Sequence, residues 1–360
     1  MVAERGRLKI DRGIPSELAR VPGIVTDLER AGYDGCWAGE IDHDPFLPVL
    51  LAAEHTTRVE VGTSIAVAFA RNPMTVANLG WDIQAYSGGR FNLGLGSQVQ
   101  AHIERRFSMP WSHPVRRMRE FVLAMRAIWS SWQDGTKLAF EGEFYTHTLM
   151  TPMFAPAPME YGTPDVYIAA VGEAMTEMCG EVGDGLLAHA FTTKRYSEEI
   201  TQPALLRGLA RAERDRSDFQ VSCPVFVVTG EDEERIVAAS AATRKQIAFY
   251  GSTPAYRRVL DLHGWGDLHT ELHRLSRLGE WDGMATLIDD EVLGEFAVVA
   301  PLDELAGALL RRCDGVIDRV MPAFPAGLSE EAVGAVLAEV REQSNALGGK
   351  VYPRTAPVPT

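Results

Sequence analysis

The chain has 360 residues, 46% of them hydrophobic and 23% charged, which is typical of a globular protein with a large core. A formal net charge of −14 argues against a nucleic-acid partner, because neutralising phosphates requires a basic surface. Four cysteines without paired spacing and no apolar run of about 18 residues argue against structural zinc, a disulfide framework and a membrane span. We therefore expect a cytoplasmic protein that acts on a small molecule and binds neither nucleic acid nor membrane.

Short apolar runs alternate with patterns of helical period along the chain. Strands separated by helices run parallel in one sheet, and eight of them favour a closed barrel over an open sheet. The predicted strands are 7–10, 35–38, 59–66, 90–95, 166–170, 185–190, 221–229 and 316–321. The sequence thus predicts an α/β fold, a (β/α)₈ TIM barrel, as a single domain over residues 1–345.

Three segments depart from this alternation. Residues 137–150, "KLAFEGEFYTHTLM", alternate in period two and predict a hairpin inserted before the fifth strand. Residues 251–294 predict a helical insertion before the eighth strand, which we interpret as a lid over the barrel mouth or as a surface excursion. Residues 346–360 are rich in Gly and Pro and predict a flexible tail.

Several familiar chemistries find little support at the strand ends. "GLGSQ" places Ser97 outside a nucleophile-elbow pattern, and the acids Glu40 and Glu173 are only a weak basis for a two-carboxylate glycosidase. "IDHD" at 41–44 carries potential metal ligands. "HTELH" at 269–273 lacks the Glu of the zinc-protease pattern, so we interpret both its histidines as a solvated helix face and predict no metal site.

Glycines at two strand ends suggest a cofactor. "FNLGLGSQ" ends a strand with Gly94 and Gly96, and "IAAVGEAM" places Gly172 at the start of a helix. Unpaired amides at a helix N-terminus favour an anion such as a phosphate, although glycine after a barrel strand is also common for steric reasons alone. Both interpretations stay open on the residues themselves.

Several stretches in order along the chain carry a resemblance to a known family. They include "AGYDGCWAGE" (31–40), "VGTSIAVAFARNPMTVA" (61–77), "WDIQAYSGGRFNLGLGSQ" (81–98), "RRFSMPWSHPVRRMREFVLAMRAIW" (105–129), "FEGEFYTH" (140–147), "DVYIAAVGEAMTEMCGEVGDGLLAHA" (165–190) and "FAVVAPLDELAGALL" (296–310). Together they resemble the luciferase-like monooxygenase superfamily, and within it the branch of oxidoreductases that depend on the deazaflavin coenzyme F420.

This resemblance implies a bacterial luciferase-like barrel, usually a homodimer, with a flavin or deazaflavin ring across the barrel mouth. It implies a non-prolyl cis peptide at the end of the third strand, here Ser64–Ile65, as part of a bulge behind the ring. An ordinary buried strand is the alternative at this point. The implied cofactor-binding residues are Ser64, Ile65, Ala66, Gly96, Ser97, Gln98, Ala170, Val171, Gly172 and Glu173.

Two positions depart from the family pattern. Glu173 lies in the first turn of the predicted helix, where its charge suits the helix dipole but repels a phosphate unless it points outward or the phosphate lies lower. Val99 stands where sugar-phosphate dehydrogenases of this branch carry an acidic residue, which disfavours that substrate.

Candidate catalytic residues follow the second and sixth strands. Many relatives carry Asp-His after the second strand, whereas this chain has Glu40-Ile41 with His43 two residues later. An imidazole can give or take the proton that accompanies hydride transfer, so His43 is the first candidate, with a helix cap at Pro45 as the alternative. Glu40 is expected to orient His43 or to contact the ring. His189 is the second candidate, with plain packing as its alternative.

The resemblance therefore predicts an F420-dependent oxidoreductase that transfers a hydride between the cofactor and a small organic substrate. The first alternative is an FMN-dependent luciferase-like monooxygenase of the same fold. The second is a barrel that binds a cofactor without turnover, which the altered Glu40-Ile41 and Val99 positions motivate. The residues do not identify the substrate.

Overall fold

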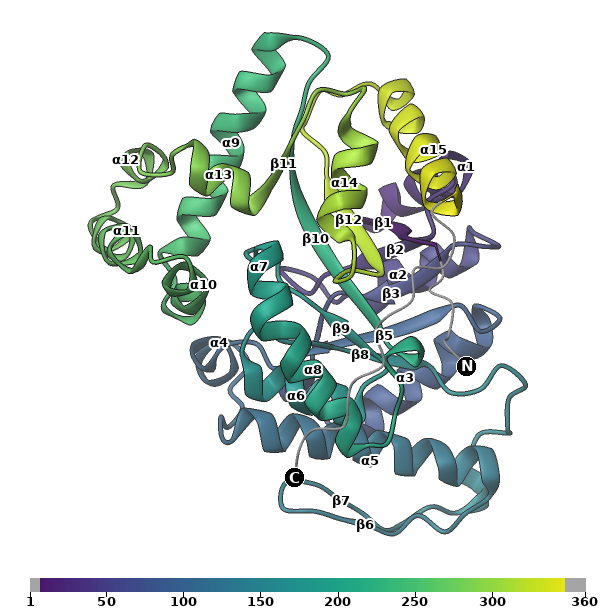
Figure 1. The fold of residues 1–360 in the computed structure, drawn as a ribbon. Helices are drawn as coiled ribbons and strands as arrows, with labels where there is room; N and C mark the ends of the chain where they lie inside the picture. The colour runs from purple at the N-terminus through teal and green to yellow at the C-terminus, as the bar shows by residue number, and fades with distance from the viewer. Residues whose placement is uncertain (1–6, 347–360) are drawn as a thin grey trace. The chain divides into compact units, whose positions relative to one another are not determined.

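The computed structural model describes residues 7–346 (Figure 1), so the predicted tail lies outside the described residues from residue 347 onward. Contacts within the chain divide it into two compact units. Of the described residues, the N-terminal unit comprises 11–187 and 204–219, and the C-terminal unit comprises 7–10, 188–203 and 220–346. The expectation of one domain over residues 1–345 stays a prediction.

The N-terminal unit contains a parallel sheet in the order β1-β2-β3-β5-β8-β9, with β4 paired to β5. Apart from β3 and β4, which only residues 64 and 65 separate, the strands of this sheet are joined by helices, which returns each strand to the same edge, as the alternating pattern predicts. The strands are β1 (Lys9–Gly13), β2 (Gly35–Ala38), β3 (Glu60–Thr63), β4 (Ala66–Val67), β5 (Phe91–Gly96), β8 (Asp165–Ala169) and β9 (Gly185–Leu187).

Local sequence signals set the ends of the helices in this unit. Gly32, with φ of 85°, ends α1 in the left-handed conformation that glycine adopts readily. The Asn72 side chain accepts a hydrogen bond from the Thr75 amide and caps α3. The helices are α1 (Val21–Ala31), α2 (Phe46–Glu54), α3 (Pro73–Tyr86), α4 (Gln100–Arg105), α5 (Pro114–Asp134), α6 (Glu173–Val182) and α8 (Gln202–Arg211), which begins two residues before this unit, with short 3₁₀ turns η1 (Leu18–Arg20), η2 (Ala68–Ala70), η3 (Pro152–Phe154) and η5 (Arg216–Asp218).

A short antiparallel pair lies within residues 137–150. Strands β6 (Phe140–Glu141) and β7 (Thr146–His147) pair with Phe140 opposite His147. The Glu120 carboxylate of α5 accepts hydrogen bonds from the amides of residues 143, 144 and 145 at 2.6–2.9 Å. One carboxylate therefore fixes the turn of this hairpin on α5.

The C-terminal unit has the strand order β11-β10-β12-β1, all parallel. Lys9 and Ile10 of β1 pair with β12, while the following residues of β1 pair with β2 in the N-terminal unit. The elements are α7 (Lys194–Tyr196), the π-helical turn η4 (Ser197–Thr201), β10 (Gln220–Val228), α9 (Glu233–Gly251), η6 (Pro254–Tyr256), α10 (Arg257–Leu262), α11 (Gly266–Leu278), α12 (Trp281–Ala285), α13 (Asp290–Phe296), β11 (Ala297–Val299), α14 (Leu305–Cys313), β12 (Arg319–Ala323) and α15 (Glu330–Ala346).

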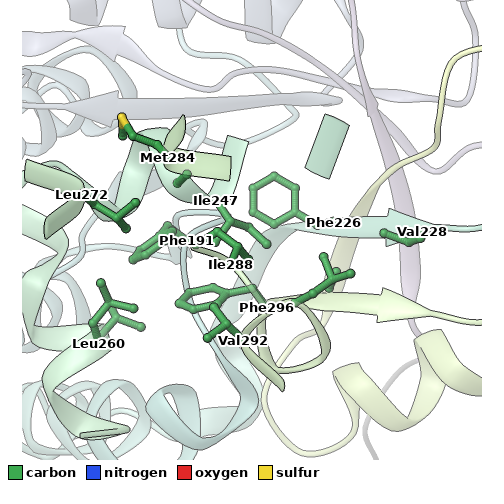
Figure 2. Close-up of a cluster of buried hydrophobic side chains, with 14 of the residues drawn as sticks. Phe191, Phe226, Val228, Ile247, Leu260, Leu272, Met284, Ile288, Val292 and Phe296 are labelled. Carbon is green, nitrogen blue, oxygen red and sulfur yellow. The ribbon is translucent and has the colours of Figure 1, made fainter. Parts of the chain in front are cut away.

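A buried apolar cluster joins the helices of residues 251–294 to the rest of the C-terminal unit (Figure 2). Phe191 follows β9, Phe226 lies on β10, Ile247 on α9, Leu260 on α10 and Phe296 at the end of α13. Phe191 and Phe296 stack with ring centroids 4.3 Å apart. These helices therefore share a core with α9 and β10. Their function as a lid stays a prediction.

The two histidines of "HTELH" do not form the solvated face that we expect. His269 is 5% exposed and its Nδ1 lies 2.7 Å from the Gly251 carbonyl oxygen, while Nδ1 of His273 lies 2.9 Å from that of Ser252. Since the last carbonyls of a helix lack intrahelical partners, both imidazoles face the end of α9 to donate to them. The expectation is therefore wrong for the buried His269.

Two negative findings apply to residues 7–346. No three His, Cys, Asp or Glu side chains there are grouped to hold a metal ion. Over the same range, no helix is both long and apolar enough to cross a membrane.

Candidate active site at the strand ends of the N-terminal unit

The third strand is bulged at the point where the sequence predicts it. Gly62 pairs with Asn92 and Ala66 with Leu95, so four residue steps on this strand face three on β5. One extra residue on one strand defines a bulge, and bulges redirect side chains next to active sites. The predicted non-prolyl cis peptide is present between Ser64 and Ile65, within this bulge.

The bulge fits against β5 because two glycines leave room for it. A Cβ on Gly94 would lie 1.7 Å from the Thr63 carbonyl oxygen, and one on Gly96 would lie 2.8 Å from the Ile65 side chain. The Thr63 hydroxyl donates to the Gly94 oxygen at 2.7 Å and accepts from the Gly94 amide at 2.9 Å. Ile65 therefore lies over Gly96, half-buried at the carboxyl edge of the sheet.

Glu40 fastens the loop after β2 to this bulge. Its amide donates to the Ile65 oxygen at 3.1 Å, and its carboxylate accepts from the Val67 amide at 2.7 Å and from Arg71 Nη1 at 2.6 Å. The Glu40 side chain is 5% exposed and that of Arg71 is 16% exposed. Charge-assisted hydrogen bonds of this kind are strong, so Glu40 has a structural function whatever else it does. Its catalytic function stays a prediction.

His43 lies in the exposed part of the same loop. Its side chain is 61% exposed, and Nε2 lies 3.6 Å from the Asp42 carboxylate. The alternative of a histidine cap on α2 is not what the structure has, because the Asp44 carboxylate accepts the Phe46 amide at 2.9 Å instead. Asp44 also pairs with Arg71 at 2.7 Å. His43 is therefore free of a capping function, and its part in proton transfer stays a prediction.

The chain turns sharply after β5. Gln98 has φ of 60°, a left-handed conformation that is uncommon for a residue other than glycine. Its side-chain oxygen accepts the Val99 amide at 3.0 Å, and the Ser97 hydroxyl donates to the Gln98 oxygen at 3.1 Å. Ser97 and Gln98 are half-buried at the end of β5, whereas Val99 is 51% exposed.

After β8, residues 170–172 lead directly into α6. Ala170 is buried and its amide donates to the Leu187 oxygen of β9 at 3.3 Å, while Val171 and Gly172 are half-buried. Gly172 is the N-cap of α6 and no side chain caps that end. The first-turn amides of Glu173 and Ala174 are therefore available to an anion, as is usual for an uncapped helix start.

The Glu173 side chain is held by α8. It is 56% exposed and its carboxylate lies 3.3 Å from Arg207, which also bonds Glu177 one turn further along α6 at 3.0 Å. Arg207 thus draws Glu173 toward a neighbouring helix and compensates its charge. This is the outward orientation in which the acid is compatible with an anion at the helix start.

The N-terminal unit thus brings most of the predicted residues to one edge. Because β2, β3, β5 and β8 are consecutive parallel strands, their carboxyl ends lie side by side. They carry the loop with Glu40 and His43, the bulge at 64–66, residues 96–98 and residues 170–173.

His189 belongs to the C-terminal unit, in the loop after β9. Its Nδ1 accepts the Phe191 amide at 3.0 Å, and its ring stacks on Tyr256 at 4.5 Å with the Tyr250 ring edge-on at 4.7 Å. Burial lowers the pKa of His189 to about 4, so this imidazole is neutral at pH 7.

Sequence reasoning did not find Arg117, which is 6% exposed at the start of α5. Its Nε donates to the Tyr145 hydroxyl at 2.9 Å, Nη1 donates to the Pro110 oxygen at 2.5 Å, and the guanidinium lies 4.6 Å from the Phe69 ring centroid. These contacts tie the segment after the bulge to α5 and the hairpin. The sequence signal that could have indicated Arg117 is the presence of both "PVRRMREF" and "FEGEFYTH" among the stretches that resemble the family.

Comparison with known proteins assigns the chain to a family. Residues 5–319 match the family described as Luciferase-like monooxygenase. The chain is 67% identical over 335 residues to the uncharacterized protein Rv1360 of Mycobacterium tuberculosis, covering 93% of this chain and 98% of that protein. It is 26% identical over 333 residues to the 5,10-methylenetetrahydromethanopterin reductase of Archaeoglobus fulgidus, covering 89% and 91%.

The fold has a solved counterpart. The coenzyme F420-dependent tetrahydromethanopterin reductase of Methanopyrus kandleri superimposes with a TM-score of 0.77 at 18% identity, covering 95% of this chain and 99% of that one. Likeness at this identity concerns the fold alone. The predicted fold class, an α/β (β/α)₈ barrel of the luciferase-like type, is confirmed.

Proposed function

We propose that this chain, which belongs to the luciferase-like monooxygenase family, is an oxidoreductase that uses coenzyme F420 to transfer a hydride to or from a small organic substrate. The family match supports the general class. Two likenesses support the deazaflavin over FMN: one in sequence to a putative coenzyme F420-dependent oxidoreductase of Mycobacterium tuberculosis, 27% identical over 304 residues, and one in fold to the coenzyme F420-dependent reductase of Methanopyrus kandleri. A cytoplasmic homodimer is part of the same proposal.

The residues of the N-terminal unit fit such a cofactor. The proposal depends on two features at the same edge of the sheet. One is the bulge, where Ile65 lies over Gly96, and the other is the uncapped N-terminus of α6, which follows a strand adjacent to β5. A flat ring requires a rigid apolar support, and a phosphate-bearing tail requires free amides. The main electrostatic obstacle to an anionic tail at this helix start is the charge of Glu173, which the ion pair with Arg207 compensates.

Each residue of this edge then has a task. Ser64, Ile65 and Ala66 would support the ring, Gly96, Ser97 and Gln98 would contact it from the next strand, and residues 170–173 would bind the anionic tail. When bound, the deazaflavin supplies or accepts the hydride. His43, on the exposed loop, would hold or deliver the accompanying proton through its imidazole.

The test is a comparison of cofactors on the apoprotein. We expect oxidised F420 to bind with micromolar affinity, measured by quenching of its fluorescence, and reduced F420 to be oxidised in the presence of a carbonyl substrate panel. The variant that tests the bulge is Ser64→Ala. The control is Ser329→Ala, which makes the same substitution outside this edge. Binding of FMN alone would reverse the choice of cofactor in favour of a monooxygenase.

The non-catalytic alternative is tested with His43→Ala. We expect this variant to bind F420 as the wild type does and to lose a large part of turnover, because proton transfer contributes about 10²–10⁴-fold in enzymes. Unchanged turnover would remove His43 from the mechanism. Cofactor binding without turnover on any substrate would support a binding protein.

A further inference from the structure

The loop of residues 40–44 has both of its ends on one guanidinium. Arg71 donates from Nη1 to the Glu40 carboxylate at 2.6 Å and from Nη2 to the Asp44 carboxylate at 2.7 Å. Both nitrogens belong to one rigid plane, so the guanidinium sets the separation of the two carboxylates. Residues 41–43 therefore lie between two ends that a single side chain holds.

Arg71 is itself fixed to the strand of the bulge. It follows η2, which comes directly after β4. Its amide donates to the Ala68 oxygen at 3.0 Å, and Nη1 also donates to the Val67 oxygen at 3.1 Å. The guanidinium lies 5.6 Å from the Phe46 ring centroid, and the side chain is largely buried. Arg71 therefore connects the loop to a well-held part of the bulged strand.

The middle of the loop leaves one side chain without a hydrogen bond. The Ile41 oxygen accepts from Arg106 Nη2 at 2.5 Å, and the Ser16 hydroxyl donates to the Asp42 carboxylate at 3.4 Å. In the described part of the chain the imidazole of His43 makes no hydrogen bond, and its contact with Asp42 is an exposed one at 3.6 Å. The place of this imidazole therefore depends on the backbone of the loop that carries it.

Asp44 holds that backbone one residue after His43. One of its carboxylate oxygens accepts the Phe46 amide at 2.9 Å, and the other accepts from Arg71. An ion pair with a half-exposed carboxylate contributes little to stability, because solvent screens it. Such a contact can still determine where a neighbouring residue lies, and a misplacement of about 1 Å can cost about 10²-fold in rate. The Arg71–Asp44 pair is therefore better suited to placing His43 than to stabilising the fold.

We propose that Arg71 is a positioning residue, which acts through Asp44 to hold the His43 imidazole at a fixed place relative to the bulge. The role of Arg71 rests on the proposed function, in which His43 holds or delivers a proton. All of the residues concerned belong to the N-terminal unit. The Arg71–Asp44 pair then affects turnover only through His43.

The first experiment measures the order of the loop without any cofactor. In deuterated, ¹⁵N-labelled protein, we expect backbone amides 41–44 of the wild type to have order parameters of about 0.85, as in rigid backbone. Asp44→Asn can still accept the Phe46 amide through its oxygen, but it then presents an NH₂ group to Arg71, so that donor meets donor. We expect the order parameters of this variant to fall below about 0.6, with Tm close to that of the wild type. Unchanged order in Asp44→Asn would overturn the proposal.

Asp27→Asn is the matched control. Asp27 pairs with Arg30 on α1 at 2.6 Å and is exposed, so the same substitution removes an ion pair outside the loop. We expect this variant to keep the wild-type order at residues 41–44. Arg71→Lys, whose single ammonium cannot reproduce two separate contacts, should loosen the loop as Asp44→Asn does. A loop that the control loosens equally would overturn the assignment to Arg71 and Asp44.

The second experiment tests whether the pair acts through His43. With reduced F420 and a carbonyl substrate that the wild type turns over, we expect Asp44→Asn to lower kcat about 10–10²-fold and to change KM less than about twofold. In a His43→Ala background the same substitution should cause no further loss, because no imidazole is left to position. A full additional loss in that background, or an unchanged kcat in the single variant, would overturn the proposal.

Failure of the proposed function is distinguishable from failure of this inference. A wild-type protein that neither binds nor oxidises reduced F420 contradicts the proposed function. A wild-type protein that turns over no faster than Asp44→Asn contradicts the positioning alone. The order parameters of residues 41–44 decide in either case whether Arg71 and Asp44 hold the loop.

Discussion

At Gly94 the sheet leaves no room for a side chain. The Thr63 carbonyl oxygen occupies the position of a Cβ, and the Thr63 hydroxyl holds both the N–H and the C=O of Gly94. Since the obstacle is backbone on the neighbouring strand, no rotamer change can relieve it. The glycine is a steric requirement of the β3–β5 pair.

We therefore predict that Gly94→Ala lowers the free energy of unfolding by about 3 kcal/mol or more, or prevents folding, because the two strands must separate. Urea denaturation monitored by circular dichroism measures it. The matched control is Gly334→Ala, in α15, where nothing lies within 4 Å of the added Cβ. That variant should be stabilised by up to about 1 kcal/mol, as for Gly to Ala in a helix. Equal effects at both positions would contradict the steric argument.

The Glu40–Arg71 pair leads to a second prediction at the same scale. Glu40→Gln keeps the shape of the side chain but removes the charge opposite Arg71, so we expect a loss of about 2 kcal/mol in the free energy of unfolding. The Asp44 side chain, the other partner of Arg71, is 45% exposed, so Asp44→Asn should cost less than about 1 kcal/mol. Chemical denaturation of both variants decides the order, and a larger effect at Asp44 would contradict it.

Among the elements, the β6–β7 hairpin depends on one carboxylate from outside it. Three successive amides converge on Glu120, and a Cβ on Gly142 would lie 2.1 Å from the same carboxylate. A side chain at position 142 would therefore push the Glu120 carboxylate away from these amides. Arg117 adds a second tie through the Tyr145 hydroxyl.

We predict that Glu120→Ala releases this hairpin while α5 stays folded. Amides 143–145 should exchange with deuterium at least about tenfold faster, since each loses the carboxylate that accepts its hydrogen bond, and protease cleavage should appear in the turn. Glu143→Gln, which removes the exposed partner of Arg116, is the control and should leave exchange nearly unchanged. Unchanged protection in Glu120→Ala would show that the hairpin is held by other contacts.

Helix α1 is joined to the start of β3 by Glu29. Its carboxylate accepts the amides of Thr57, Arg58 and Val59 at 2.6–3.1 Å. Burial raises the pKa of Glu29, but the three amides outweigh burial and hold the pKa below its ordinary value of about 4.5. A lowered folded-state pKa gives stability that is present above pH 4.5 and is lost as the pH falls through the folded-state value.

We predict that Glu29→Gln flattens the decrease of stability below pH 4.5 and lowers stability at pH 7, because the charge-assisted hydrogen bonds are lost. Thermal denaturation from pH 3 to pH 7 measures both effects. Glu17→Gln, which disrupts an exposed ion pair with Arg20, is the control and should change neither appreciably. A parallel shift at all pH values would contradict the linkage.

The sequence predicted the elements with clear periodicity and missed those formed by tertiary pairing. All eight predicted strands overlap observed ones, with β1 starting two residues later and running to Gly13. The two-residue β4 and the three-residue β11 are too short to give an alternation. They exist because β5 and β10 offer them an edge.

The candidate site was predicted in its positions but not in its contacts. The cis peptide followed from the family resemblance, since no local pattern specifies one. The side-chain partners of Glu40 and Glu173, and the Tyr145 hydroxyl that Arg117 contacts, lie 27 or more residues away in sequence, where spacing carries no information. The inward-facing His269 was missed for the same reason, because its acceptor is the end of another helix.

For the whole molecule, cofactor choice has a thermodynamic consequence. A ligand that binds only the folded chain stabilises it by an amount set by its concentration relative to Kd, about 2.7 kcal/mol at 100 times Kd. We predict that F420 at that excess raises Tm by several degrees and that FMN at the same concentration raises it less. Differential scanning fluorimetry measures both. A larger shift with FMN would favour the monooxygenase alternative.

The contact between Ile65 and Gly96 ties the sizes of two residues 31 positions apart. A smaller side chain at 65 would make space for an alanine at 96, whereas no change at 65 could do so for Gly94, which meets backbone. Among homologous sequences, the residues at positions 65 and 96 should therefore covary in size, whereas position 94 should remain glycine. In this Gly-x-Gly, the first glycine, Gly94, is required by the close approach of β3 to β5. A pattern search that treats the motif as a ligand signature would therefore misinterpret Gly94.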